Sequence, residues 1–206
     1  HESVLAAAHQ YACQEAPVTQ QGIVDIDALM KLINDRTVLV SIMYANNEVG
    51  SIQPIHQIAL LLEEIKRGRR KQGNTLPLYL HTDAAQASPY LDLHTARLGV
   101  DFMTLNAGKM YGPKQAGIVF AGSHTRLRPQ VFGGGQERGI RSGTENVAGA
   151  VGSARALELV QKRRCGEGER LQKLQELFFE LLEEQIPGVI INGSRKNRLP
   201  NNIHIT

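Results

Sequence analysis

The sequence contains no tryptophan, few other aromatic residues and only two cysteines. Cys13 and Cys165 lie far apart and belong to no Cys-x-x-Cys pair or cysteine–histidine cluster, which excludes a zinc site and a disulfide framework. We therefore expect no metal site and a reducing compartment, the cytoplasm, with the mitochondrion as the alternative. No apolar run reaches the roughly 18 residues of a membrane span, and we find no secretory signal, so we expect no membrane partner.

Positive charge is in slight excess and locally concentrated. The formal net charge is +3, and much of the excess lies in "KRGRRKQG" (66–73) and "RKNR" (195–198). Such runs are usually solvated surface, and the alternative interpretation is contact with an anionic partner. No aromatic residues are interleaved with them and no nucleic-acid motif is present, so we expect no nucleic-acid partner.

Helix-like and strand-like segments alternate along the first part of the chain. With 206 residues, of which 42% are hydrophobic, the chain can bury a substantial core. Apolar spacing predicts helices over 1–14, 25–34 and 55–70, and strands within 37–45, 76–87, 96–107 and 115–123. The β-branched run at 37–45 is typical of a strand buried on both faces. This α/β alternation predicts a three-layer αβα fold around a mostly parallel sheet.

The second part of the chain has a different organisation. A glycine-rich segment at 132–144 predicts a structured loop, and two helices are predicted over 145–164 and 168–186. The segment 188–206 predicts two short strands around a basic turn. We expect a large domain over 1–150, lacking its N-terminal part, and an incomplete smaller α+β domain over 151–206.

Polar residues follow the predicted strands at the point where each strand ends. They are Asn46 to Glu48, His81 to Gln86 and Asn106 to Lys109, with the glycine-rich loop as a fourth polar segment. In open α/β sheets, ligands bind at the carboxyl ends of the strands. A carboxylate, amides and an amine together suit a polar aromatic cofactor that carries an aldehyde.

Each of these residues has a structural alternative. Lys109 lies beside the small Ala107 and Gly108, so it suits a cofactor-binding amine, or it is a surface lysine before a turn. Asp83 suits the protonated ring nitrogen of a cofactor, or it caps a helix. Gln86 reaches the ring oxygen if the chain turns into a helix there. The glycine-rich loop offers Arg141, Ser142, Thr144 and backbone N–H groups to a phosphate, although such loops are common.

Four segments in succession resemble the signature blocks of one family. They are "MYANNEVGSIQPI", "HTDAAQA", "GKMYGPKQAGIVF" and "FGGGQERGIRSGTENV". On these blocks the chain resembles the cysteine desulfurase family, which includes selenocysteine lyases. The resemblance implies a fold-type I, homodimeric enzyme that uses pyridoxal 5'-phosphate. Its implied reaction removes sulfur from L-cysteine, leaving L-alanine and a persulfide on a cysteine of the enzyme. The sulfur then passes to an acceptor such as an iron–sulfur scaffold protein.

The resemblance also implies roles for individual residues. Lys109 resembles the lysine that bonds covalently to the cofactor, and His1, in "HESVLAAA", resembles the histidine that stacks on the ring. Asp83 and Gln86 match the ligands of the ring nitrogen and the ring oxygen. The remaining matches are Asn47 near ring and substrate, Arg141 near the substrate, and Thr144 at the phosphate of the neighbouring subunit.

The chain departs from the family pattern in two respects. Where the family has Ser-x-His-Lys, this chain has Asn106-Ala107-Gly108-Lys109, so Asn106 takes the place of a phosphate-binding serine and Gly108 offers only its backbone N–H. Neither Cys13 nor Cys165 matches the family's nucleophilic cysteine, which we expect outside this chain, so that this segment alone is inactive. Two alternatives remain, a selenocysteine lyase and a catalytically impaired regulatory relative.

Overall fold

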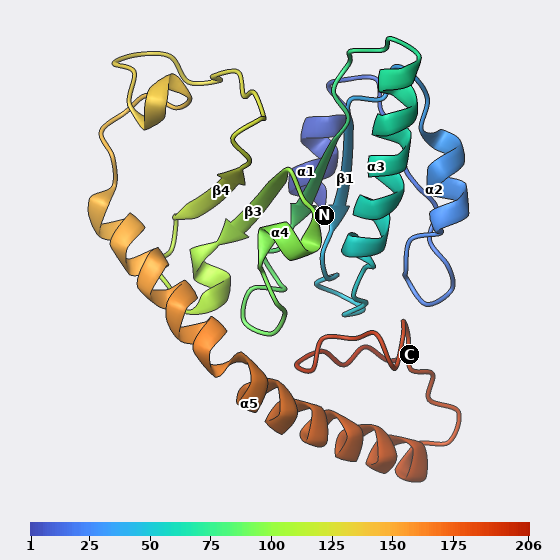
Figure 1. Cartoon of the computed structure of the whole chain (residues 1–206). Coiled ribbons are helices and arrows are strands. Elements are labelled where there is room, and N and C mark those ends of the chain that lie inside the picture. Colours follow the sequence, from blue (N-terminus) through green and yellow to red (C-terminus); the bar gives the residue numbers. More distant parts are fainter.

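The computed structural model describes all residues from 1 to 206 and has a four-stranded sheet at its centre (Figure 1). The strands are β1 (Leu39–Met43), β2 (Tyr79–Asp83), β3 (Phe102–Asn106) and β4 (Gly117–Ala121), and they are adjacent in chain order. The pairs β1–β2 and β2–β3 are parallel, whereas β3–β4 is antiparallel. The predicted α/β fold with a mostly parallel sheet is confirmed.

The helices connect and cover these strands. They are α1 (Glu2–Ala8), α2 (Ile26–Leu32), α3 (Ile55–Lys71), α4 (Thr95–Leu98) and α5 (Val147–Gln185), with 3-10 helices η1 (Ala107–Met110) and η2 (Glu137–Gly139). In Figure 1, α2 and α3 lie to one side of β1 and α1 lies to the other. The first helix is shorter than the predicted 1–14.

The main core lies between α3 and one face of the sheet. Ile55, Ile58 and Leu62 recur at helical spacing on α3 and are almost completely buried, in one cluster with Val40 and Leu80 from the strands. This apolar stripe explains why residues 55–71 form a helix, because one face has a sheet to pack against. The core therefore holds the strands in place from one side.

The opposite face of β1 is less covered than the sequence predicts. Val40 is buried, but Leu39 and Ser41 are exposed, so the expectation of burial on both faces is wrong. The physical reason is that α1, on that side, is only seven residues long and has no buried residue. A continuous apolar run predicts a strand, but it does not determine what covers the second face.

The antiparallel strand β4 follows from a short connection. Residues 107–116 between β3 and β4 form only the 3-10 helix η1 and a turn. A parallel return needs a crossover of about a dozen residues or more, usually with a helix, so the chain folds straight back along β3.

Residues 147–185 form one continuous helix, so the prediction of two helices is wrong. The predicted break lies at "CGEGE", where Gly166 and Gly168 lower helix propensity by about 1 kcal/mol each. Packing at both ends of α5 outweighs this cost. Ala156 packs against η1, and Phe179 is 2% exposed.

The C-terminal segment forms two isolated bridges instead of two regular strands, one of them between Arg198 and Ser51. Ile191 pairs with Ile205, and the intervening turn is held by Gln175, whose amide donates to the carbonyls of Leu199 and Asn202 at 2.9 and 2.6 Å. Leu199 belongs to the main core cluster. The turn is thus held by hydrogen bonds from a side chain of α5 to backbone carbonyls. These contacts are tertiary, so the strand propensity of the segment does not predict them. The domain division at 150/151 remains a prediction.

We expect Gly166→Ala and Gly168→Ala each to raise the free energy of unfolding by about 0.5–1 kcal/mol, because alanine restricts the unfolded chain and favours the helix. A Cβ atom at either position meets no other atom within 4 Å. The matched control is Gly152→Ala, whose Cβ would lie 2.6 Å from Cγ of Pro113 and which should destabilise the protein. Urea denaturation measures all three, and equal effects at the three sites would contradict the packing described for α5.

Candidate active site at the carboxyl edge of the sheet

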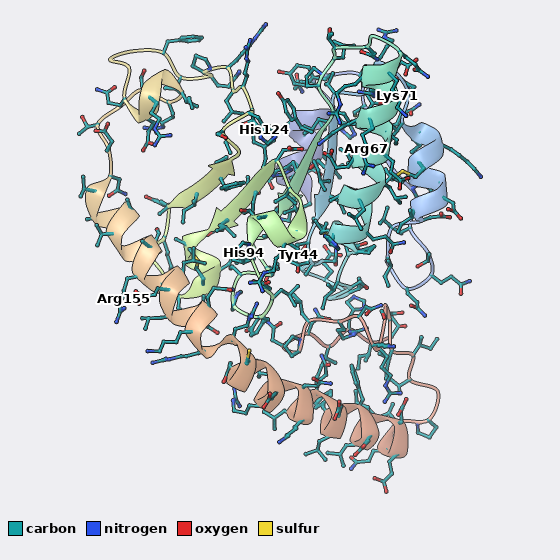
Figure 2. All side chains as sticks on the ribbon, in the orientation of Figure 1. Tyr44, Arg67, Lys71, His94, His124 and Arg155 are labelled. Carbon is teal, nitrogen blue, oxygen red and sulfur yellow. The ribbon has the colours of Figure 1, made fainter.

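The carboxyl ends of β1, β2 and β3 meet at one edge of the sheet. Met43 pairs with Asp83, and Asp83 pairs with Thr104. Backbone bonds continue the pairing past the strand ends, since the N–H of Tyr44 donates to the carbonyl of Asp83 at 2.7 Å and that of Ala84 to Thr104 at 2.9 Å. The loops that follow the three strands therefore begin side by side, with Tyr44 marking this edge in Figure 2.

Asp83 ends β2 as a half-buried carboxylate. Its Oδ1 accepts a bond from the backbone N–H of Ala85 at 3.0 Å, and no cation of the chain pairs with it. The carboxylate thus caps a turn, not a helix, and keeps its second oxygen for a ligand. Gln86 lies half-buried in the same turn, and its amide makes no hydrogen bond within the protein.

Lys109 is presented by η1, directly after β3. Ala107 and Met110, three residues apart, are both fully buried against Ala156 of α5, whereas Gly108 and Lys109 between them are exposed. Side chains at this spacing lie on one face of a 3-10 helix, so burial of one face directs the other outward. Gly112 allows the close approach, because a Cβ there would lie 3.0 Å from both the carbonyl oxygen of Ala107 and the Cβ of Ala156.

Asn106 and Gly108 form a local bond that the sequence does not predict. The Oδ1 of Asn106 accepts a hydrogen bond from the Gly108 N–H at 2.9 Å. Gly108 therefore uses its N–H within the chain. The Nδ2 of Asn106 remains available as a donor at the exposed end of β3.

The loop after β1 is shaped by Asn46 and exposes Asn47. The Oδ1 of Asn46 accepts bonds from the N–H groups of Glu48 and Val49, both at 2.9 Å. Asn47 lies exposed in the resulting turn. The two adjacent amides have different tasks, one structural and one free for a ligand.

His1 and the glycine-rich loop are not joined to this group by any hydrogen bond. His1 is exposed and caps α1, its Nδ1 accepting from the Ser3 N–H at 3.1 Å. Arg141 and Thr144 are also exposed, in the segment between β4 and α5. Buried Ser142 organises this loop through its Oγ, which accepts from the Gly135 N–H at 3.3 Å.

His81 lies in a polar segment that the sequence indicates, but sequence reasoning assigns this histidine no role of its own. The Nδ1 of His81 lies 2.7 Å from the Oγ of Ser41, and its Nε2 lies 3.2 Å from the Oγ1 of Thr104. The imidazole thus links three strands on the face that also carries Asp83, two residues on. Burial lowers the pKa of His81, and the Asp83 carboxylate opposes this with a smaller effect. The one available signal was the His-x-Asp spacing, which places both side chains on one face.

Other functional features are few. No three or more histidine, cysteine or acidic side chains lie together as a metal site would need. None of the helices has the length and hydropathy to cross a bilayer. Cys13 and Cys165 are both free thiols at the surface.

Known proteins match this chain along its length. The family model described as Aminotransferase class-V matches residues 2–206. The chain is 38% identical to Cysteine desulfurase IscS of Dictyoglomus turgidum, in a match that covers 100% of this chain and 51% of that protein. Two solved structures, a NifS-like protein and a NifS-like protein from Rickettsia africae ESF-5, superpose with TM-scores of 0.88 and 0.87 at 33% and 30% identity. Both superpositions cover 100% of this chain and 55% of the other, so the chain spans about half the length of these relatives.

We expect the stability of the protein to fall as the pH drops below the unfolded-state pKa of His81, 6.5. Below that pH, His81 binds a proton more readily in the unfolded chain than in the folded protein, so protonation favours unfolding. Above that pH, His81 is neutral in both states and its protonation no longer lowers the stability. In His81→Gln the decline between about pH 7 and pH 5 should be shallower, as measured by urea denaturation. His56→Gln, at an exposed position on α3, is the control, and an unchanged slope in His81→Gln would contradict the assignment.

Proposed function

The chain belongs to the class-V aminotransferase family, and we propose that the full-length protein is a cysteine desulfurase that uses pyridoxal phosphate. It would remove sulfur from L-cysteine, leave L-alanine and form a persulfide on a cysteine of the enzyme. The observation that carries the proposal is the placement of an unpaired carboxylate, Asp83, and an exposed amine, Lys109, after neighbouring strands of one edge. The names of the similar proteins support the same reaction.

The residues at the edge fit pyridoxal phosphate, the cofactor of this family. Bound there, the cofactor supplies an electron-accepting ring. The free oxygen of Asp83 would accept a hydrogen bond from the ring nitrogen and keep it protonated. The Gln86 amide, which has no partner in the protein, suits the ring oxygen, and the Asn106 Nδ2 suits the phosphate. Gly108, exposed and without a side chain, leaves space beside the amine.

Lys109 would have two tasks. Its amine would hold the cofactor covalently, and as a free amine it would take the proton from Cα of bound L-cysteine. A firm position serves both tasks, and the buried Ala107 and Met110 anchor the turn that carries the lysine. Asn47, exposed after β1, would contact the substrate on the neighbouring side of the edge.

A homodimer would give the glycine-rich loop its role. Arg141 and Thr144 are exposed and form no hydrogen bond to Asp83 or Lys109 of their own chain, so they suit the substrate and the phosphate of a partner's site. Large apolar side chains around the loop and the start of α5 support a second copy, since Phe132 is 81% and Val151 is 64% exposed. We further propose a cytoplasmic location and an iron–sulfur scaffold protein as the sulfur acceptor, and the similarity to cysteine desulfurases supports this acceptor.

In Lys109→Ala we expect the visible absorbance of protein-bound pyridoxal phosphate to disappear. Borohydride reduction followed by mass spectrometry should find an adduct on Lys109 in the full-length wild-type protein and none in the variant. Lys114→Ala, at a nearby exposed lysine, is the control and should keep both signals. An adduct that persists in Lys109→Ala would reject this role.

Asp83→Ala should retain part of the cofactor and lower alanine production from L-cysteine about 100-fold or more, because the ring nitrogen loses its anionic partner. Turnover of the full-length variant measures this loss. The same assay with selenocysteine distinguishes a selenocysteine lyase, and normal turnover of L-cysteine in the variant would exclude Asp83 from the reaction.

For the homodimer, we expect Phe132→Glu together with Val151→Glu to shift the full-length protein from dimer to monomer in sedimentation velocity, because two charges would be buried unpaired at the interface. Leu60→Glu introduces the same charge on α3 at a side chain 55% exposed and should leave the dimer intact. A dimer that survives the double variant would place the interface elsewhere.

A further inference from the structure

The C-terminal end of α3 carries exposed cations without acidic partners. Arg67, Arg70 and Lys71 are exposed and form no ion pair, and Arg36, in the loop before β1, is likewise exposed and unpaired. Lys66 differs, because it is held 2.8 Å from Glu63 and 3.3 Å from the buried carboxylate of Asp101. The positive charge at this end of the helix is therefore available to a partner.

A buried arginine fastens the loop with Arg36 to the end of the helix. Arg69 is only 4% exposed, and its Nη2 donates to the carbonyls of Asn34 and Thr37, the latter at 2.9 Å. Its Nε and Nη1 are buried and have no hydrogen-bond partner. A guanidinium with no carboxylate beside it adds its charge to this region.

Apolar side chains lie beside the cations. Val38 and Leu76 are 47% and 49% exposed, in the segments that enter β1 and β2. These segments run together, since Asn74 donates from its Nδ2 to the Asp35 carbonyl at 3.0 Å and the Tyr79 N–H donates to the Val38 carbonyl at 2.9 Å. We define the α3 basic surface by its six residues, Arg36, Val38, Arg67, Arg70, Lys71 and Leu76.

The charge of this surface is not balanced locally. The acidic residues next to it in sequence are Asp35 and Glu64, and neither forms an ion pair with its cations. Figure 2 shows Arg67 and Lys71 on the upper part of α3, well away from Arg155 on α5. Because α3 starts after the carboxyl edge and runs back along the strands, its C-terminal end lies at the opposite edge from Lys109.

We propose that the α3 basic surface docks an acidic, amphipathic segment of a partner protein. The unpaired cations select acidic side chains, and Val38 and Leu76 offer apolar contact to the same segment. A protein suits this mixture better than a nucleic acid, because the surface has no aromatic side chain on which a base can stack. The partner would leave the carboxyl edge of the sheet open. It would therefore localise or regulate the protein and would not be the protein that accepts the sulfur.

The test uses the full-length protein and a fluorescent synthetic helical peptide with leucines on one face and glutamates on the other. Anisotropy should show saturable binding that weakens with salt. In Arg70→Glu with Lys71→Glu we expect affinity to fall about tenfold or more, and in Leu76→Asp to fall as well. Arg155→Glu, at an exposed arginine of α5, is the matched control and should bind as the wild type does.

Melting curves check that each variant is folded, which is expected because all the substituted side chains are exposed. Equal affinity of the wild type and the double charge-reversal variant would overturn the proposal. So would polyglutamate or single-stranded RNA binding as tightly as the peptide, because either result would show general attraction of anions. These outcomes do not depend on the cofactor, so they are separate from failure of the proposed enzymatic function.

Discussion

Parallel hydrogen bonding of β1, β2 and β3 is the constraint on which the candidate site depends. It brings three loops that are far apart in sequence to one edge, and the bond between the Ala84 N–H and the Thr104 carbonyl extends the alignment beyond the strands. The core under α3 supports this register from one face only. On the other face, His81 lies within hydrogen-bonding distance of Ser41 and Thr104, so polar contacts link the three strands where few apolar side chains cover the sheet.

Position and reactivity are supplied by different residues. Asn46 accepts the hydrogen bond that shapes the turn with Asn47. Asn106 accepts a hydrogen bond from the Gly108 N–H, next to Lys109. The buried side chains of Ala107 and Met110 hold the turn of Lys109 against α5. The groups that the proposed chemistry needs keep free donors or acceptors, as the second oxygen of Asp83 does. The small residues around Lys109 serve both sides of the turn. Gly108 leaves space on the exposed side, and Ala107 and Gly112 allow close packing against α5 on the buried side.

Strand positions and the edge that gathers Asp83 and Lys109 could be predicted from the sequence, because apolar runs and the residues that follow them are local signals. The continuous α5 could not, since the glycine cost at 166 and 168 is local whereas the compensating burial of Phe179 is tertiary. The exposed face of β1 was missed for the same reason. The sequence indicates a polar segment that begins at His81, but it does not reveal the role of His81, because its partners Ser41 and Thr104 are 40 and 23 residues away in sequence.

The continuity of α5 links two parts of the structure that are far apart. A helix of 39 residues is about 58 Å long, and it contacts η1 through Ala156 and the C-terminal turn through Gln175. One element therefore supports the turn that presents Lys109 near its first half and orders the C-terminal turn near its second half. A substitution that broke the helix between Ala156 and Gln175 would separate these two supports.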